Sequence, residues 1–351
     1  MALSSRGTPG RGEVRLRFDP AGLDADLRMV LLDLPAGRWL SMRDLLARTD
    51  RSLGWGQWVA RTQVLGAAAA GTDVVRAWRA EEPDSADASV MHARVAVERT
   101  ARAHRMGHPD VLGLWEEAIE ACRVAAYTAP ADPVPWVCLL ALAQLDERQE
   151  VPEHRLPSPD PLLATGPWDV LGQVERRDPG NREAYHRMMA LMASRADGSW
   201  GQAHQFVRWA LDRAPRGSAL LVLPLYVRVG LWRDQHGPGR ELDMYWAGDY
   251  AVQDAERALH DWFDVVEPAG HPSLSVLDLS HLAHALWAAH RFDAAARVFT
   301  AMGPSAATRP WVYRADDPRR PAEDAATEWI VRARAQCGAP VHGDPRGGPR
   351  R

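Results

Sequence analysis

Apolar residues recur every three to four positions along nearly the whole chain, the spacing that puts them on one face of an α-helix. Alternation of apolar and polar residues, the pattern of a half-buried strand, is almost absent. Segments with Pro or Gly interrupt the helical pattern throughout the 351 residues. The sequence therefore predicts an all-α protein of many helices joined by turns.

The clearest repeated unit runs from residue 276 to residue 303. We expect Asp293 to lie at the N-terminus of a second helix, because a carboxylate there meets unpaired backbone N–H groups and the positive end of the helix dipole. Gly303, followed by Pro, should end that helix. The first helix is predicted by apolar residues at helical spacing, which are Leu279, Leu282, Ala283 and Leu286. The unit is therefore a helical hairpin, with Ala295 and Phe299 on the inner face of its second helix.

This hairpin resembles a tetratricopeptide repeat (TPR). The residues that carry the resemblance are Leu279, Leu282, Ala283, Leu286, Ala295 and Phe299. Leu279, Ala283 and Leu286 replace the Trp, Gly and Tyr usual in the first helix, and the terminal Pro is out of register. The resemblance implies a right-handed α-solenoid of TPR-like hairpins.

Weaker copies of the unit precede it along the chain. Their predicted first helices are at 88–105, 133–145 and 181–194, and their second helices at 118–130, 168–179 and 203–215. The chain as a whole also resembles a group of uncharacterised actinobacterial helical-repeat proteins, through DPGNREAYHRMMALMA and RPWVYRADDP. This second resemblance implies no known activity.

The predicted organisation has four parts. Residues 1–15 and 336–351 are rich in Gly, Pro and Arg and are predicted to be disordered tails. Residues 16–82 are predicted as a helical N-terminal extension, and 83–335 as the TPR-like domain. Trp311 and Tyr313 should fold back on the last hairpin, and a final helix over 321–335 should cap the coil.

Composition excludes several classes of function. The net charge of −4 gives no sign of a nucleic-acid partner, and no apolar run is long enough to span a membrane. The three cysteines are far apart and form no CxxC pair, and no signal sequence precedes them, which favours reduced thiols in a cytoplasmic protein.

By analogy with TPR proteins, one face of each first helix should line a concave groove that holds a peptide. The residues predicted for this face are Leu277, Ser280, His284, Trp287, Tyr185, Met188 and Met192. For Tyr185 and the methionines, packing between repeats is an alternative, since Met fills irregular cores. His284 and Trp287 are expected to be accessible to a partner.

Other chemistry finds less support. Asp278, His281 and His284 recur at steps of three, but this spacing drifts around a helix and lacks a fourth metal ligand, so solvated histidines are the better interpretation. A helix-turn-helix can be traced over 42–65, but Gly54 and Gly56 would begin its recognition helix. The 15 Trp raise the alternative of an all-α enzyme such as a terpenoid cyclase. Its acidic pair would be Asp316 and Asp317, but Pro-Arg-Arg follows them rather than more acids, and no catalytic constellation is evident.

The sequence thus predicts a scaffold or adaptor that binds a protein or peptide in its concave face, without a cofactor or metal. The alternative is an enzyme or sensor whose small ligand lies in a pocket on the same face. A closed pocket with convergent polar groups would favour this alternative.

Overall fold

A computed structural model describes residues 15–52, 54–236, 243–268, 274–315, 317 and 319–339. Over these ranges the regular structure is helical, with no β-strand and only two isolated β-bridges. The predicted all-α class is confirmed. None of the helices in the same ranges is both long enough and apolar enough to cross a membrane.

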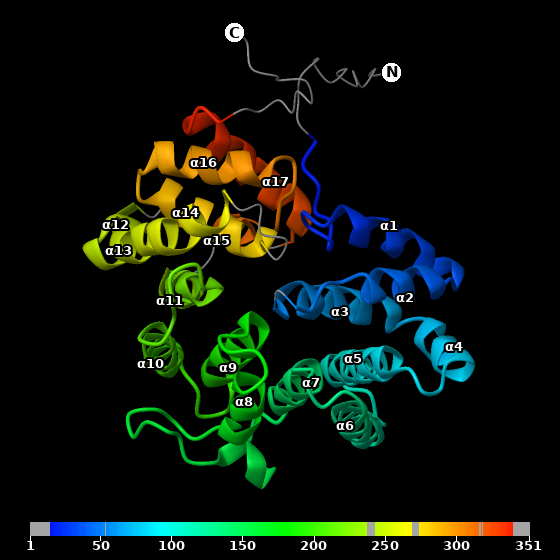
Figure 1. The fold of residues 1–351 in the computed structure, drawn as a ribbon. Coiled ribbons are helices and arrows are strands. Elements are labelled where there is room, and N and C mark those ends of the chain that lie inside the picture. The colour runs from blue at the N-terminus through cyan, green and yellow to red at the C-terminus, as the bar shows by residue number, and fades with distance from the viewer. Residues whose placement is uncertain are drawn as a thin grey trace, which may run out of the picture.

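Helices α1 to α7 form one arc of a ring-shaped arrangement (Figure 1). Polar N-caps start several helices of the chain: Asp24 accepts a hydrogen bond from the Leu27 N–H, and Ser85 accepts one from the Ala88 N–H. The helices of this arc are α1 Ala25–Asp33, α2 Leu40–Ala47, α3 Gly56–Ala69, α4 Val74–Glu81, α5 Ala86–Arg105, α6 Val111–Thr128 and α7 Val134–Ala143, with a 3₁₀ turn at Leu34–Ala36.

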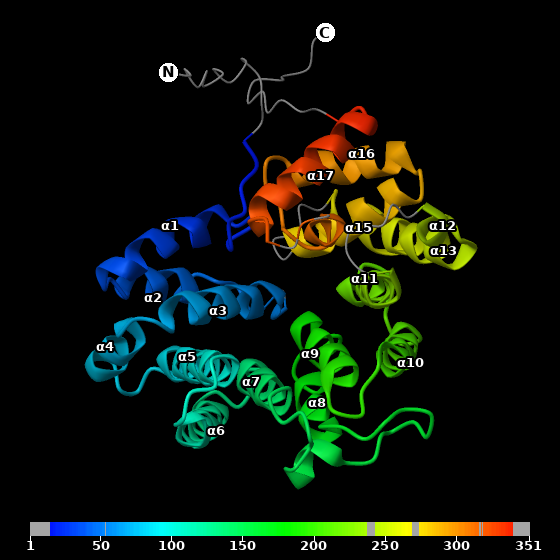
Figure 2. The same ribbon diagram turned by 180° about the vertical axis from the view of Figure 1, so that it is seen from behind.

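The remaining helices form the opposite arc (Figure 2). They are α8 Trp168–Glu175, α9 Arg182–Ser194, α10 Trp200–Leu211, α11 Leu223–His236, α12 Asp243–Ala247, α13 Asp249–Arg257, α14 Asp264–Val266, α15 Val276–Ala288, α16 Phe292–Met302 and α17 Ala322–Gln336. A π-helical segment, Ala258–Phe263, joins α13 to α14. Short 3₁₀ turns lie at Pro152–Arg155, Ala219–Val222 and Trp311–Arg314.

Two apolar cores divide the ring into two lobes. We call residues 21–142, which share a core that includes Trp58 and Trp78, the N-terminal lobe. We call residues 137–339, whose core includes Phe206 and Phe299, the C-terminal lobe. The apolar packing of the N-terminal lobe passes across residue 82, so α5 and α6 pack with the predicted extension. The boundary predicted at residue 82 stays a prediction.

Helix α7 belongs to both lobes. Val134 and Cys138 pack in the N-terminal core, whereas Val137 and Leu140 pack in the C-terminal core. A helix that is apolar on all sides is stable only when it is buried, and α7 meets this condition because it lies between the lobes. It therefore joins the two lobes on one side of the ring.

The two ends of the chain meet on the other side of the ring. We call residues 16–22 the N-terminal strap. The Arg17 N–H donates to the Pro304 carbonyl, and the Ala306 N–H donates to the Arg17 carbonyl, both at 2.9 Å. Both ribbon views accordingly place α1 beside α17 (Figures 1 and 2). The chain thus closes on itself.

The predicted hairpin at 276–303 matches α15 and α16. Leu282, Ala295 and Phe299 are fully buried, as expected for side chains on the inner faces of the hairpin. The prediction that Asp293 lies at the start of the second helix is confirmed: α16 begins at Phe292, and Asp293 lies in its first turn. The two helices are joined by a turn at His290, whose φ of 59° lies in the left-handed region.

The predicted cap is present. Trp311 is fully buried on the last hairpin, where its indole Nε1–H donates to the Ser280 hydroxyl at 2.8 Å, and α17 follows. Residues 336–339 were predicted to begin a disordered tail, but Gln336 ends α17 and Ala339 is buried. Residues 1–14 and 340–351 lie outside the described residues.

Candidate functional site

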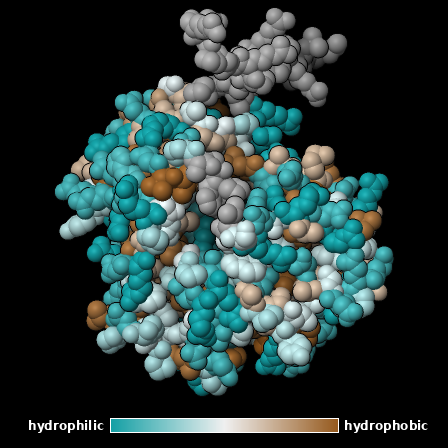
Figure 3. All heavy atoms as spheres, viewed as in Figure 1, coloured by the Kyte–Doolittle hydropathy of each residue, from teal (hydrophilic) through white to brown (hydrophobic). Residues whose placement is uncertain are grey.

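A cavity of about 1130 Å³ lies between the two lobes. Its wall on the N-terminal lobe comes from the strap, the start of α1 and α3. Figure 3 shows a hollow near the centre of a mostly hydrophilic face. The segments that contribute lining residues are 18–27, 56–64, 175–185, 213–220, 262–266, 274–278 and 306–308, with residue 323. The cavity is thus built by residues from both ends and the middle of the chain.

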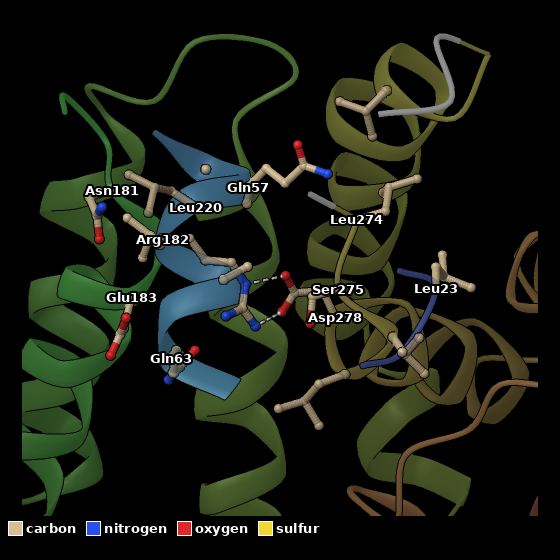
Figure 4. Close-up of a pocket in the computed structure, with 18 of the residues that line it drawn as sticks. Leu23, Gln57, Gln63, Asn181, Arg182, Glu183, Leu220, Leu274, Ser275 and Asp278 are labelled. Carbon is tan, nitrogen blue, oxygen red and sulfur yellow. Dashed lines mark hydrogen bonds and ion pairs between the residues drawn. The ribbon is translucent and has the colours of Figure 1, made fainter. Parts of the chain in front are cut away.

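Arg182 and Asp278 form an ion pair on the C-terminal wall of the cavity (Figure 4). Arg182 Nε and Nη2 donate to the two oxygens of the Asp278 carboxylate at 2.5 and 2.6 Å. Burial favours the neutral form of Asp278, but the pair with Arg182 outweighs this effect and lowers the pKa of the Asp278 carboxyl. The two-pronged contact fixes the guanidinium and ties α9 to α15.

Aromatic side chains support this pair from behind. The Tyr226 hydroxyl of α11 donates to Asp278 Oδ1 at 2.5 Å, and the Tyr226 ring stacks on His281 with centroids 3.7 Å apart. His186 packs edge-on against Tyr226. Burial lowers the pKa of His186 to about 3 and that of His281 to about 4, so both imidazoles are neutral near neutral pH.

A second ion pair connects the two lobes beside the cavity. Arg94 of α5 donates from Nη1 and Nη2 to Glu183 of α9 at 2.8 and 2.7 Å, and both side chains are about 95% buried. Arg187 donates to the same carboxylate. Burial would raise the pKa of Glu183, but Arg94 and Arg187 lower it to about 2. Glu183 also lines the cavity.

Two carboxyl groups in the cavity wall have no arginine partner among the described residues. Glu175 accepts hydrogen bonds from the Gly180 N–H and the Tyr185 hydroxyl, and Asp178 accepts one from the Asn181 amide. Burial is the main cause that raises the pKa of both carboxyl groups. The wall therefore places the Arg182–Asp278 ion pair near carboxyl groups whose pKa is raised.

The structure divides the residues predicted for the groove. Leu277 and Tyr185 line the cavity, and their predicted role in binding stays a prediction. Five others do not line the cavity and are at least nine-tenths buried, namely Ser280, His284, Trp287, Met188 and Met192. The accessibility expected for His284 and Trp287 is wrong, because the 3₁₀ turn at Trp311–Arg314 covers that face of α15. Met188 and Met192 pack in the core, which is the alternative given for them above.

His284 and Trp287 lie in an aromatic cluster under the C-terminal cap. Arg314 Nε donates to His284 Nε2 at 2.8 Å, and the Arg314 guanidinium lies over the ring of Trp287, 4.6 Å from its centroid. Burial holds the pKa of His284 well below its usual value. The expectation of solvated histidines is therefore wrong for His281 and His284, which are buried.

Sequence reasoning missed Arg94, Arg182 and Glu183. One signal was available: Arg182 and Glu183 directly follow Asn181, which the structure shows to be the N-cap of α9. Charged residues in the first turn of a helix that starts at a buried Asn lie near the interior. The partners of these residues are 89 and 96 positions away in the chain and left no local pattern.

The metal-site, helix-turn-helix and cyclase hypotheses can also be compared with the structure. No group of three or more His, Cys, Asp or Glu side chains in the described part of the chain is arranged to hold a metal ion. In the region read as a helix-turn-helix, Arg61 of α3 is buried and paired with Asp24 at 2.7 Å. Asp316, from the acidic pair weighed for a cyclase, lies outside the described residues.

Comparison with protein-family profiles, with curated proteins and with solved structures finds no match to this chain.

Proposed function

We propose that the protein binds a small polar ligand in the cavity between its lobes. The observation that carries this proposal is the cavity itself, about 1130 Å³ in volume and walled by both lobes. Ligand sites are concave and combine apolar surface with a few placed polar groups. Here Leu220 and Val276 supply apolar surface, and Arg182, Gln57 and Glu175 supply polar groups.

The fixed geometry of the polar groups supports this proposal. Arg182 is held by two hydrogen bonds to Asp278 and contacts the Tyr226 hydroxyl through Nη2, so its guanidinium cannot turn freely. Groups fixed before binding lose little conformational entropy when a ligand arrives. The wall is therefore suited to recognising one arrangement of polar atoms.

A second candidate is the binding of a peptide segment of a protein partner, as in a TPR scaffold. The volume of about 1130 Å³ also leaves room for a peptide, because it slightly exceeds the roughly 300–1,000 Å³ of typical small-molecule pockets. We further propose that the hairpins are TPR-like units of a right-handed solenoid. The packing of α5 on α6, α9 on α10 and α15 on α16 supports this architecture. Free cysteines are consistent with a protein of the cytoplasm.

Filling the cavity tests the proposal. Ala60 of α3 lines the cavity and is exposed within it, so Ala60→Trp should occupy the space without disturbing either core. The matched control is Ala68→Trp, at an exposed position of the same helix outside the cavity. Thermal unfolding of each protein is measured with amino acids, short peptides, sugars and nucleosides.

A ligand that binds only the native state raises the melting temperature in proportion to its occupancy. At least one compound should raise the melting temperature of the wild type and of Ala68→Trp, but not of Ala60→Trp. Stabilisation by single small molecules supports the first candidate, and stabilisation by peptides alone supports the second. If no compound stabilises the wild type, or if Ala60→Trp responds equally, the cavity is not the site.

A further inference from the structure

The lobes are joined more strongly on one side of the ring than on the other. On the α7 side they share a buried helix and the ion pair of Arg94 with Glu183. On the strap side the backbone contacts are the two hydrogen bonds of Arg17 and a 3.4 Å bond from the Ser305 hydroxyl to the Gly22 carbonyl. Separation of the lobes would therefore begin at the strap.

The two ends of the strap attach to different lobes. Leu16 and Phe18 are half-buried against the core of the C-terminal lobe. At the other end, Arg28 of α1 binds the Asp19 carboxylate through Nε at 2.5 Å and the Gly22 carbonyl through Nη2 at 2.6 Å. These bonds keep the second end on the N-terminal lobe when the first end leaves its site.

The strap also forms part of the cavity wall. Residues 18–24 all line it, and Gly22 brings the strap close to α15. A Cβ atom on Gly22 would lie 3.1 Å from Val276 Cγ2, and the φ of +56° at Gly22 favours glycine. The close fit at this point means that the cavity wall is continuous only while the strap is docked.

We propose that the N-terminal strap is a gate: release of Leu16, Arg17 and Phe18 from the C-terminal lobe widens the cavity, which is partly open while the strap is docked, and α7 acts as the hinge. This proposal rests on the proposed function, because a gate has a role only if the cavity binds a ligand. Its test measures access alone and needs no ligand, so the two ideas can fail separately.

A cysteine inside the cavity reports its opening. Ala219→Cys places a thiol on the wall of the C-terminal lobe, in a background where the partly exposed Cys337 is replaced by Ser. The other two cysteines are buried. The rate of modification is measured with a maleimide on a polyethylene glycol chain, because the access of so bulky a reagent depends on the width of the cavity. Ala68→Cys, exposed outside the cavity, gives the rate for a free thiol.

Phe18→Ala should raise the modification rate of Ala219→Cys about tenfold, because it removes apolar contact that holds the strap in place. The rate at Ala68→Cys should not change. Leu32→Ala, at an exposed apolar position of α1, is the control and should leave both rates unchanged. Equal rates with and without Phe18 would overturn the gate.

Ser305→Ala is a milder second variant. It removes the hydrogen bond to the Gly22 carbonyl and no apolar contact of the strap. It should raise the rate at Ala219→Cys by a smaller factor, with an unchanged far-UV circular dichroism spectrum and melting temperature. If Phe18→Ala fails to fold, this variant decides: a rate equal to that of the parent contradicts the proposal. An equal rise at Ala68→Cys also contradicts it, since that rise reports general unfolding.

Discussion

Arg94 and Glu183 lie 89 positions apart in the chain and form a buried, two-pronged ion pair across the two lobes. A buried charge is tolerated only with its partner, so this pair selects one relative position of α5 and α9. The ion pair contributes less to the free energy of unfolding than its short N–O distances suggest, because burial removes both charges from water.

Glu183→Gln should therefore destabilise the protein by about 3–5 kcal/mol, since the Arg94 guanidinium stays buried without a full countercharge. Arg94→Met should have an effect of similar size. The double variant Arg94→Met with Glu183→Met should be clearly less unstable than the sum of the single effects. Urea unfolding followed by circular dichroism measures all four proteins, and additive effects would show that the pair is not coupled.

His284→Ala should destabilise the protein by about 1–3 kcal/mol, because it leaves the buried Arg314 Nε without its acceptor. This is the opposite of what an exposed groove residue would do. His204→Ala, at an exposed position of α10, is the control and should change stability by no more than about 0.5 kcal/mol. Chemical denaturation of both variants measures these changes in the free energy of unfolding. Equal, small effects would place His284 on an accessible surface after all.

The class of the fold and most helices could be predicted from the sequence because both depend on local patterns. The periodicity of Leu279, Leu282 and Leu286 predicts a helix wherever its neighbours lie, and a Gly after the last apolar residue ends it. The same patterns do not say which face of α15 will be covered. Trp311 and Arg314 arrive from later in the chain and bury the face assigned to His284.

The site could be predicted only in part for a related reason. Tyr185 and Leu277 line the cavity, but Met188 and Ser280, predicted for the same helix faces, are buried in the core, so the face of a helix alone does not predict the cavity wall. The cavity itself depends on ring closure, and this rests on backbone hydrogen bonds of Arg17 that any residue other than proline could make. Backbone contacts between distant segments produce no recognisable pattern in a single sequence.

Phe299→Ala should cost about 3–5 kcal/mol, as expected for a large side chain removed from a filled core. Phe299 is fully buried, with Trp311 on one side and the Arg334 guanidinium 5.1 Å from its ring centroid. Hydrogen exchange should show the C-terminal helices α15 to α17 losing protection before α1 to α6, because each unit contacts mainly its neighbours. Uniform loss of protection over the whole chain would mean that the ring unfolds as one unit.

Asp132 provides a test by pH. Its carboxylate accepts hydrogen bonds from the Val134 N–H at 2.7 Å and from the indole Nε1–H of Trp58 at 2.8 Å, and it is 2% exposed. Burial outweighs these bonds and raises the pKa of Asp132 from 3.8 to about 6. The native state therefore holds this proton more tightly than the unfolded state. The stability that it contributes is present below pH 3.8 and is lost as the pH rises through about 6.

Asp132→Asn removes the titration and keeps the size of the side chain. The free energy of unfolding of the wild type, minus that of the variant, should fall by about 3 kcal/mol between the two pKa values, since one unit corresponds to about 1.4 kcal/mol. Urea unfolding of both proteins at a series of pH values measures this difference, in which the titrations of all other groups cancel. A difference that is constant with pH, or that rises with it, would show that the Asp132 carboxyl is not protonated preferentially in the folded protein.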